Sequence, residues 1–338
     1  MADSSTIPIL DAGALTSGDP SAKATLVEEF ATAYREVGFS YIVNHGVDQT
    51  LIERVFEASR QFHRLPLAEK MAIELNSANR GFLPMDATLD VNTTLAEVTK
   101  PNRSESFLMM CDHAPDSPEV RAGDYLAGQN VWPDIPGFRE TLTEYHDAMS
   151  GLGRKMIGLA AIALSSDPEV MVEHFDSPVA SVRLLHYPPV PDGSPDDLYG
   201  SAPHHDFGCL TLLAQDDVGG LQVRPRGQDW IDVPNIGGSF VVNVGDMLRL
   251  WSNGLLLSTP HRVKNTTEQS RFSVPFFFDP HVSTTIAPLQ SCVTPERAAA
   301  YEPVVFGEHL RAELEAGFEP HKVFGADRFE PKGKQRNN

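Results

Sequence analysis

Hydrophobic residues recur at helical spacing in three parts of the chain. Residues 22–37 and 51–62 each show the three- and four-residue steps of an amphipathic helix, and a longer pattern over 138–164 predicts a scaffold helix. The segment GFSYIVNHGV, residues 38–47, is short, β-prone and bounded by glycines. This composition predicts a strand between the first two helices.

Later in the chain the hydrophobic pattern changes to that of short strands. From about 181 to 279 the β-prone segments SVRLLHY, CLTLLAQ, LQVRP, DWIDVP, SFVVNVG, HRVKN and RFSVPFFF are separated by Pro, Gly, Asn and Asp. Such spacing predicts an antiparallel sandwich or barrel. Residues 76–135 are polar and weakly periodic, which predicts long loops with short strands such as SESFLMM, and long loops often carry function. The tail EPKGKQRNN is expected to be disordered.

Composition restricts the partners more than the fold. The chain has 338 residues, 41% hydrophobic and 22% charged, which allows one large core with helical decoration. Its 27 Lys and Arg against 46 Asp and Glu give a net charge of −19. So acidic a surface repels nucleic acid and anionic lipid, so we expect neither as a partner. An anionic ligand would need a local basic pocket.

The cysteines and the N-terminus favour a cytoplasmic protein. Cys111, Cys209 and Cys292 are odd in number and far apart, which suits neither a disulfide framework nor a CxxC zinc site. The start MADSSTIPILDAG has no basic region followed by a long apolar one, and no apolar run has the length of a membrane span.

The stretch SAPHHDFGCLTLLAQ, residues 201–215, places two histidines and an aspartate before a predicted strand. In an extended segment His204 and Asp206 point the same way and His205 points elsewhere. His261, at the start of HRVKN, can supply a third ligand if the sheet brings its strand alongside. Two imidazoles and one carboxylate leave three positions of an octahedral metal open, as in non-haem Fe(II) oxygenases, whereas zinc would prefer a closed tetrahedron.

The strand RFSVPFFF supplies the basic pocket. Arg271 and Ser273 share one face of this strand, and a guanidinium beside a hydroxyl is well suited to holding a carboxylate. An arginine that points inward needs an anionic partner.

These motifs together carry a family resemblance. HHDFGCLTLL, GGLQV, VNVGD, STPHRV and RFSVPFF, with LLHYPP upstream, resemble the core of the isopenicillin N synthase-like Fe(II)/2-oxoglutarate-dependent dioxygenases. The stretch from IPILD to GFSYIVNHGV is similar to that family's N-terminal region, so the resemblance covers roughly residues 7 to 310. HxD alone is a weak signal, but HxD, a distant His and RxS in this order are specific.

The resemblance implies a mainly β fold with flanking helices around a double-stranded β-helix, or jelly roll. We expect an N-terminal mixed region over 1–175, the jelly-roll core over 176–285 and a C-terminal helical segment and tail over 286–338. The implied activity is oxidation of a small molecule, hydroxylation first, with O₂ activation coupled to decarboxylation of 2-oxoglutarate to succinate and CO₂. Desaturation and cyclisation remain open.

The resemblance also assigns residues to roles. It implies that iron is held by His204, Asp206 and His261, and that the distal carboxylate of 2-oxoglutarate is held by Arg271, Ser273 and Tyr187. Many plant members have an asparagine two residues before that tyrosine, where this chain has Leu185. One polar contact to the cosubstrate is therefore in doubt.

Other residues near the motifs receive a weaker assignment. Arg183 lies four residues before Tyr187 and on the same strand face, where it either enters the substrate pocket or forms an ion pair at the barrel rim. Phe207 follows Asp206 directly and is a candidate pocket wall, whereas Phe276 and Phe278 are expected in the core. The segment VNVGD, residues 242–246, is expected to be a strand ending in a Gly-Asp turn rather than a source of ligands.

Two alternatives stay open at this point. Some relatives oxidise their substrate with O₂ and without 2-oxoglutarate, and isopenicillin N synthase keeps RxS for its own substrate's carboxylate, so RxS does not separate the two cases. The other alternative is a metal-free binding or scaffold protein on a degenerate jelly roll. The intact triad disfavours it.

Overall fold

The computed structural model of the protein describes residues 7–88, 95, 100–190, 193–195, 197–265 and 267–318. The expected disordered tail, residues 330–338, lies outside this part. A larger sheet has, in spatial order, strands β1 (Ile9–Asp11), β2 (Phe39–Val43), β10 (Phe240–Val244), β7 (Leu210–Gln215), β12 (Arg271–Asp279), β5 (Val179–Tyr187), β4 (Glu105–Met110) and β3 (Gly81–Leu83). A smaller sheet has strands β6 (Ser201–His204), β11 (His261–Val263), β8 (Leu221–Val223) and β9 (Ile231–Asp232), and β13 (Thr285–Ile286) pairs with β14 (Val304–Val305). Strand pairing is antiparallel except between β1 and β2.

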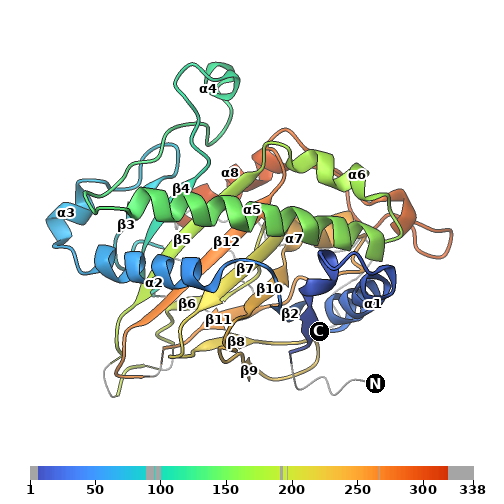
Figure 1. Ribbon diagram of the computed structural model, residues 1–338, viewed down its shortest axis with the longest axis horizontal. Helices are drawn as coiled ribbons and strands as arrows, with labels where there is room; N and C mark the ends of the chain where they lie inside the picture. Colours follow the sequence, from blue (N-terminus) through green and yellow to red (C-terminus); the bar gives the residue numbers. More distant parts are fainter. Residues whose placement is uncertain are drawn as a thin grey trace.

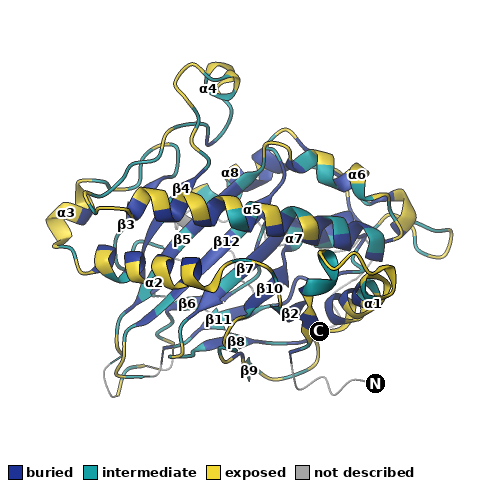
Figure 2. Cartoon of the chain, viewed as in Figure 1, coloured by how far each residue is buried: buried dark blue, intermediate teal, exposed yellow. Residues whose placement is uncertain are grey.

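The helices surround this core. They are α1 (Pro20–Glu36), α2 (Gln49–His63), α3 (Leu67–Met71), α4 (Pro118–Ala122), α5 (Phe138–Ala163), α6 (Pro168–Val172), α7 (Asp246–Trp251) and α8 (Phe306–Phe318), with the 3-10 helices η1 (Ala12–Leu15), η2 (Glu173–Phe175) and η3 (Gln290–Cys292). Figure 1 shows α2 and α5 lying across one face of the larger sheet. Both helices expose their outer sides and cover buried strands (Figure 2). None of the helices described is long and apolar enough to cross a membrane.

Alternation along β12 gives the larger sheet two different faces. Val274, Phe276 and Phe278 join the large apolar cluster that includes the helices, so the expectation of two core phenylalanines is confirmed. Arg271 and Ser273 point to the opposite face. On that face a second apolar cluster joins residues of both sheets, among them Tyr187, Val223 and Val263. The two sheets thus enclose the interior of a jelly roll, as the family resemblance implied.

One expected strand was too long, and some elements were missed. The strand expected over 38–47 is confined to β2 because Asn44 and Gly46 take positive φ values of 52° and 80°, which end an extended segment. The polar region 76–135 contains the short helix α4 besides its strands. The Gly-Asp turn expected at the end of VNVGD was wrong, since Asp246 begins α7.

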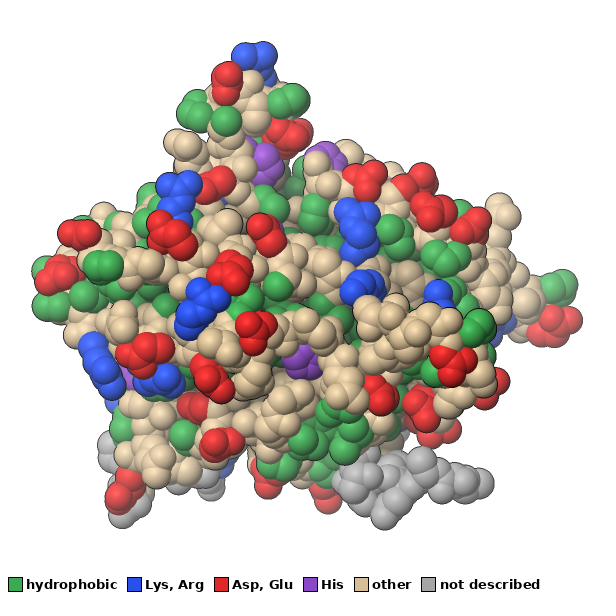
Figure 3. All heavy atoms as spheres, in the orientation of Figure 1, with side chains coloured by type: hydrophobic (Ala, Val, Ile, Leu, Met, Phe, Trp, Pro, Cys, Tyr) green, Lys and Arg blue, Asp and Glu red, His purple; other side chains and the backbone are tan. Residues whose placement is uncertain are grey.

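The acidic composition is spread out on the face that bears α2 and α5. Figure 3 shows Asp and Glu side chains scattered over this face with Lys and Arg side chains between them. The net charge of −19 therefore does not gather into a single acidic patch on this face.

Candidate active site

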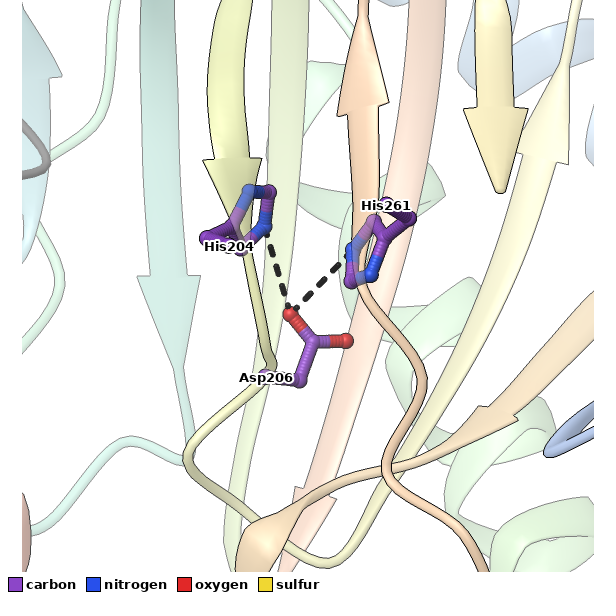
Figure 4. A group of neighbouring side chains, drawn as sticks. All are labelled: His204, Asp206 and His261. Carbon is purple, nitrogen blue, oxygen red and sulfur yellow. Dashed lines mark ion pairs between the residues drawn. The ribbon is translucent and has the colours of Figure 1, made fainter. Parts of the chain in front are cut away.

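The structure brings His204, Asp206 and His261 together at one end of the smaller sheet. His204 ends β6 and His261 begins β11, and the two residues are directly paired across these antiparallel strands. The Oδ1 atom of Asp206 lies 3.6 Å from Nε2 of each histidine (Figure 4). One ligand atom from each of the three residues lies within 4.8 Å of the others. The expected convergence of distant segments is therefore observed, although Asp206 lies just beyond the strand.

Backbone carbonyls orient both imidazoles. Nδ1 of His204 lies 2.7 Å from the carbonyl oxygen of Ala202, and Nδ1 of His261 lies 3.3 Å from that of Thr259. A proton on each Nδ1 leaves the Nε2 lone pairs facing Asp206, which is the tautomer that a metal requires. Burial, followed by repulsion from His204, lowers the pKa of His261 to about 4, so this ring is neutral near pH 7.

Two further side chains hold the carboxylate of Asp206. Its Oδ2 accepts hydrogen bonds from the Thr211 hydroxyl at 2.5 Å and the Asn243 amide at 2.7 Å. Burial alone would raise the pKa of Asp206, but His261, His204 and Thr211 together lower it below the ordinary value. The group is thus a carboxylate whose other oxygen, Oδ1, is turned towards the imidazoles.

His205 points away from this group, as strand alternation predicted. Its Nδ1 lies 3.2 Å from the Ser258 hydroxyl. Burial is the main cause of a lowered pKa for His205. The residue contacts the neighbouring loop instead of adding a fourth ligand to the triad.

Arg271 belongs to a second group of polar side chains in the barrel interior, with Ser273, Gln215 and Tyr187. Its side chain is fully buried, with Nη1 3.2 Å from the Ser273 hydroxyl and Nη2 3.1 Å from Oε1 of Gln215. The guanidinium carbon lies 4.8 Å from the centre of the Tyr187 ring. Among the described residues no carboxylate forms an ion pair with Arg271, and its Nε has no hydrogen-bond partner. Such a buried cation fits an anionic ligand.

Comparisons with known proteins bear on this geometry. The 2OG-Fe(II) oxygenase superfamily model matches residues 168–280, and a model described as non-haem dioxygenase in morphine synthesis N-terminal matches residues 7–135. A 2-oxoglutarate-Fe(II) type oxidoreductase of Emericella nidulans is 35% identical, over 90% of this chain and 88% of its own. The chain belongs to the 2OG-Fe(II) oxygenase superfamily.

Two other members of the superfamily are similar over most of their length. A homoarginine-6-hydroxylase of Arabidopsis thaliana is 33% identical over 87% of this chain and 90% of its own. A full-length Neurospora crassa protein, solved in complex with alpha-KG and thymine, superposes with a TM-score of 0.81 at 26% identity, covering 94% of this chain and 98% of that one. The chain is accordingly a 2-oxoglutarate-dependent non-haem iron dioxygenase, which uses Fe(II), 2-oxoglutarate and O₂.

The residues of this oxygenase fit the two groups that the superfamily uses. Two imidazoles and a carboxylate are suitable ligands for Fe(II) and would leave the other side of the metal open. Arg271 has an Nε without a hydrogen-bond partner and, among the described residues, forms no ion pair with a carboxylate, which suits a dicarboxylate cosubstrate. Neither the metal-free scaffold nor the cosubstrate-free oxidase is favoured by these comparisons.

The three residues expected near the substrate have different surroundings. Arg183 and Leu185 lie on the same face of β5 as Tyr187, and Nε of Arg183 donates to the Ser106 hydroxyl at 2.9 Å. Leu185 packs against the apolar cluster of the interior. Phe207 is half-buried beside His309 of α8, whose Nε2 lies 3.1 Å from the Phe207 carbonyl oxygen.

Sequence reasoning missed the residues that support the site. Thr211 and Asn243 contact Asp206, and Gln215 contacts Arg271. Side chains of these three types also occur in ordinary strands. A signal was available in retrospect, because each lies at an interior-facing position of β7 or β10 where an apolar residue would be usual. Asn243 was expected to belong to the strand of VNVGD and not to contact a ligand.

Proposed function

We propose that two groups of side chains hold the iron and the cosubstrate: His204, Asp206 and His261 for Fe(II), and Arg271, Ser273 and Tyr187 for the distal carboxylate of 2-oxoglutarate. The observation that carries this proposal is the convergence of three ligand atoms within 4.8 Å in a barrel whose interior also holds a fully buried arginine. Among the described residues, that arginine forms no ion pair with a carboxylate.

The chain's own residues bind and orient in this scheme. Iron and 2-oxoglutarate supply the oxidising chemistry when bound, with succinate and CO₂ formed from the cosubstrate. Thr211 and Asn243 fix one oxygen of Asp206 and leave the other for the metal. The apolar cluster shared by the two sheets, which includes Val223 and Val263, keeps water from the buried guanidinium.

We propose hydroxylation of a small molecule as the reaction. The Arabidopsis thaliana relative is named a homoarginine-6-hydroxylase, and the Neurospora crassa structure contains thymine, so compounds of this size suit the superfamily. Arg183, Leu185 and Phe207 are our candidates for substrate contact, because two share the Tyr187 face and one adjoins Asp206. The three cysteines are unpaired, which suits a cytoplasmic enzyme.

We also retain the expected division of the chain as a proposal. In this division the jelly-roll core occupies 176–285 between a mixed region, 1–175, and a C-terminal segment, 286–338. The two family models, over 7–135 and 168–280, support a change of character between the first two parts.

The test is a screen of small metabolites for succinate formation that depends on the added compound. Homoarginine and thymine are reasonable first members of the panel. Hydroxylation predicts a product that has gained one oxygen atom from O₂, and Asp206→Ala should form neither product nor succinate. A product that has lost two hydrogens and gained no oxygen would show desaturation or ring closure instead.

A further inference from the structure

The turn that carries Asp206 rests directly on the side chain of Asp279. Asp279 ends β12, and its Oδ1 accepts the backbone N–H of Cys209 at 2.5 Å. A Cβ atom at Gly208 would lie 2.2 Å from the same oxygen. The carboxyl group therefore touches two consecutive residues of the turn, and glycine is required at 208 because any side chain would overlap it.

The surroundings of Asp279 make this contact costly. The residue is 5% exposed, and among the described residues no Lys, Arg or His forms an ion pair with it. Burial, the largest effect, raises its pKa to about 7. A buried carboxyl without a cation lowers stability, so a valine or leucine would serve the core better. A residue that is unfavourable for packing at such a position suggests a specific structural or functional role.

The other contacts of the turn indicate what the role of Asp279 is. Backbone N–H groups of the 245–247 segment already bind three of its carbonyls: Asp246 to Asp206 at 2.7 Å, Met247 to Gly208 at 2.9 Å and Gly245 to Cys209 at 3.0 Å. The N–H of Cys209 is left to a side chain, and Asp279 accepts it. The turn is thus held from one side by backbone and from the other by this carboxyl.

We propose that Asp279 is a positioning residue that sets the location of the Asp206 carboxylate by accepting the N–H of Cys209. The proposal rests on the proposed role of Asp206 as an iron ligand. Asp279 itself does not touch the iron ligands, and it acts through the backbone of residues 206–209. Loss of this contact should change the affinity of the site for Fe(II) and the geometry of its ligands.

The test compares Asp279→Leu with Asp279→Asn in the full chain. Leucine removes the acceptor, whereas asparagine keeps an oxygen in the same place. Fe(II) affinity would be measured anaerobically by competition with a chelator. We expect the dissociation constant to rise about 10- to 100-fold in Asp279→Leu, because the buried N–H of Cys209 loses its acceptor, and to stay within about threefold in Asp279→Asn, which keeps an acceptor. The visible charge-transfer band formed with 2-oxoglutarate should shift in the first variant alone.

A matched control and a second variant complete the design. Asp216 also accepts a backbone N–H of the β12 region, from Phe272 at 2.6 Å, at the other end of that strand. Asp216→Ala should leave Fe(II) affinity within about twofold, because the two sites are far apart along β12. If Asp279→Leu fails to fold, Gly208→Ala disturbs the same contact with one methyl group and should weaken iron binding in the same way.

Three results would overturn the proposal. One is a folded Asp279→Leu or Gly208→Ala variant with unchanged Fe(II) affinity and an unshifted band. Another is an Asp279→Asn variant as weak as Asp279→Leu, because charge and not the acceptor would then matter. The third is a raised KM for substrate with unchanged iron binding, which would make Asp279 a substrate contact. Failure of the proposed function is separate, since it would appear as normal iron binding in Asp206→Ala.

Discussion

Replacement of Arg271 by alanine should weaken 2-oxoglutarate binding strongly and leave iron binding intact. The guanidinium is fully buried, and its Nη atoms contact the neutral oxygens of Ser273 at 3.2 Å and Gln215 at 3.1 Å. Its charge is therefore available to a ligand carboxylate. A hydrogen bond to a charged group contributes about 1.5–3 kcal/mol, and about 1.4 kcal/mol is tenfold in binding. We expect the dissociation constant of 2-oxoglutarate to rise about 10- to 100-fold.

The assay is an anaerobic titration of the iron-loaded protein with 2-oxoglutarate, followed by the visible charge-transfer band, which needs no substrate. Arg271→Lys should recover part of the loss, because an ammonium keeps the charge and loses the planar fork. Arg262→Ala is the matched control. Arg262 is a partly buried arginine of the smaller sheet that stacks 4.2 Å from the Trp230 ring centre. Unchanged 2-oxoglutarate affinity in a folded, iron-binding Arg271→Ala would refute the reasoning and point to the substrate's carboxylate as the ligand of Arg271.

Three further predictions concern the metal site and the fold. Asp206→Ala should lose tight Fe(II) binding and turnover and His205→Ala should keep both, as measured by metal content after dialysis; the reverse pattern would mean that the ligands are wrongly assigned. Lys70→Met should lower the free energy of unfolding, measured by urea titration, by about 3–5 kcal/mol. Lys70 and Glu105 form a buried ion pair at 2.7 Å, and the variant would leave the Glu105 carboxylate without this cation. A loss below about 1 kcal/mol would contradict a stabilising buried pair. Burial, with repulsion from His186, holds the pKa of His63 at about 3, against 6.5 for a free histidine. Because the unfolded chain therefore binds one more proton, the free energy of unfolding should fall as the pH drops from about 6.5 towards 3, by up to about 1.4 kcal/mol per pH unit. The fall should be shallower in His63→Gln, and an equal slope in the variant would argue against a buried neutral ring.

The triad could be predicted from the sequence because strand alternation is a local rule and because the order of its motifs resembles that of a known family. Alternation separates His205 from its neighbours, and an antiparallel return brings His261 opposite His204. The alternation of β12 likewise placed Arg271 and Ser273 inside. These positions follow from a period of two and from the order of motifs along the chain, both of which the sequence displays.

The supporting contacts could not be predicted in the same way. Asp279 meets Cys209 across 70 residues, and His309 meets Phe207 across 102 residues. No local pattern marks such pairs, since an aspartate at a strand end is usually a turn residue. The helix α7 was missed for a related reason, because its first residues are held by the Asp206 turn and not by a local cap.

The most direct test of the account is the binding of Fe(II) and 2-oxoglutarate in sequence under anaerobic conditions. We predict one Fe(II) per chain, followed by a weak visible charge-transfer band when 2-oxoglutarate is added, because the triad leaves one side of the metal open and Arg271 lies in the same interior. The band should be absent in His261→Ala. Iron bound at one per chain with no band at saturating 2-oxoglutarate would contradict the account.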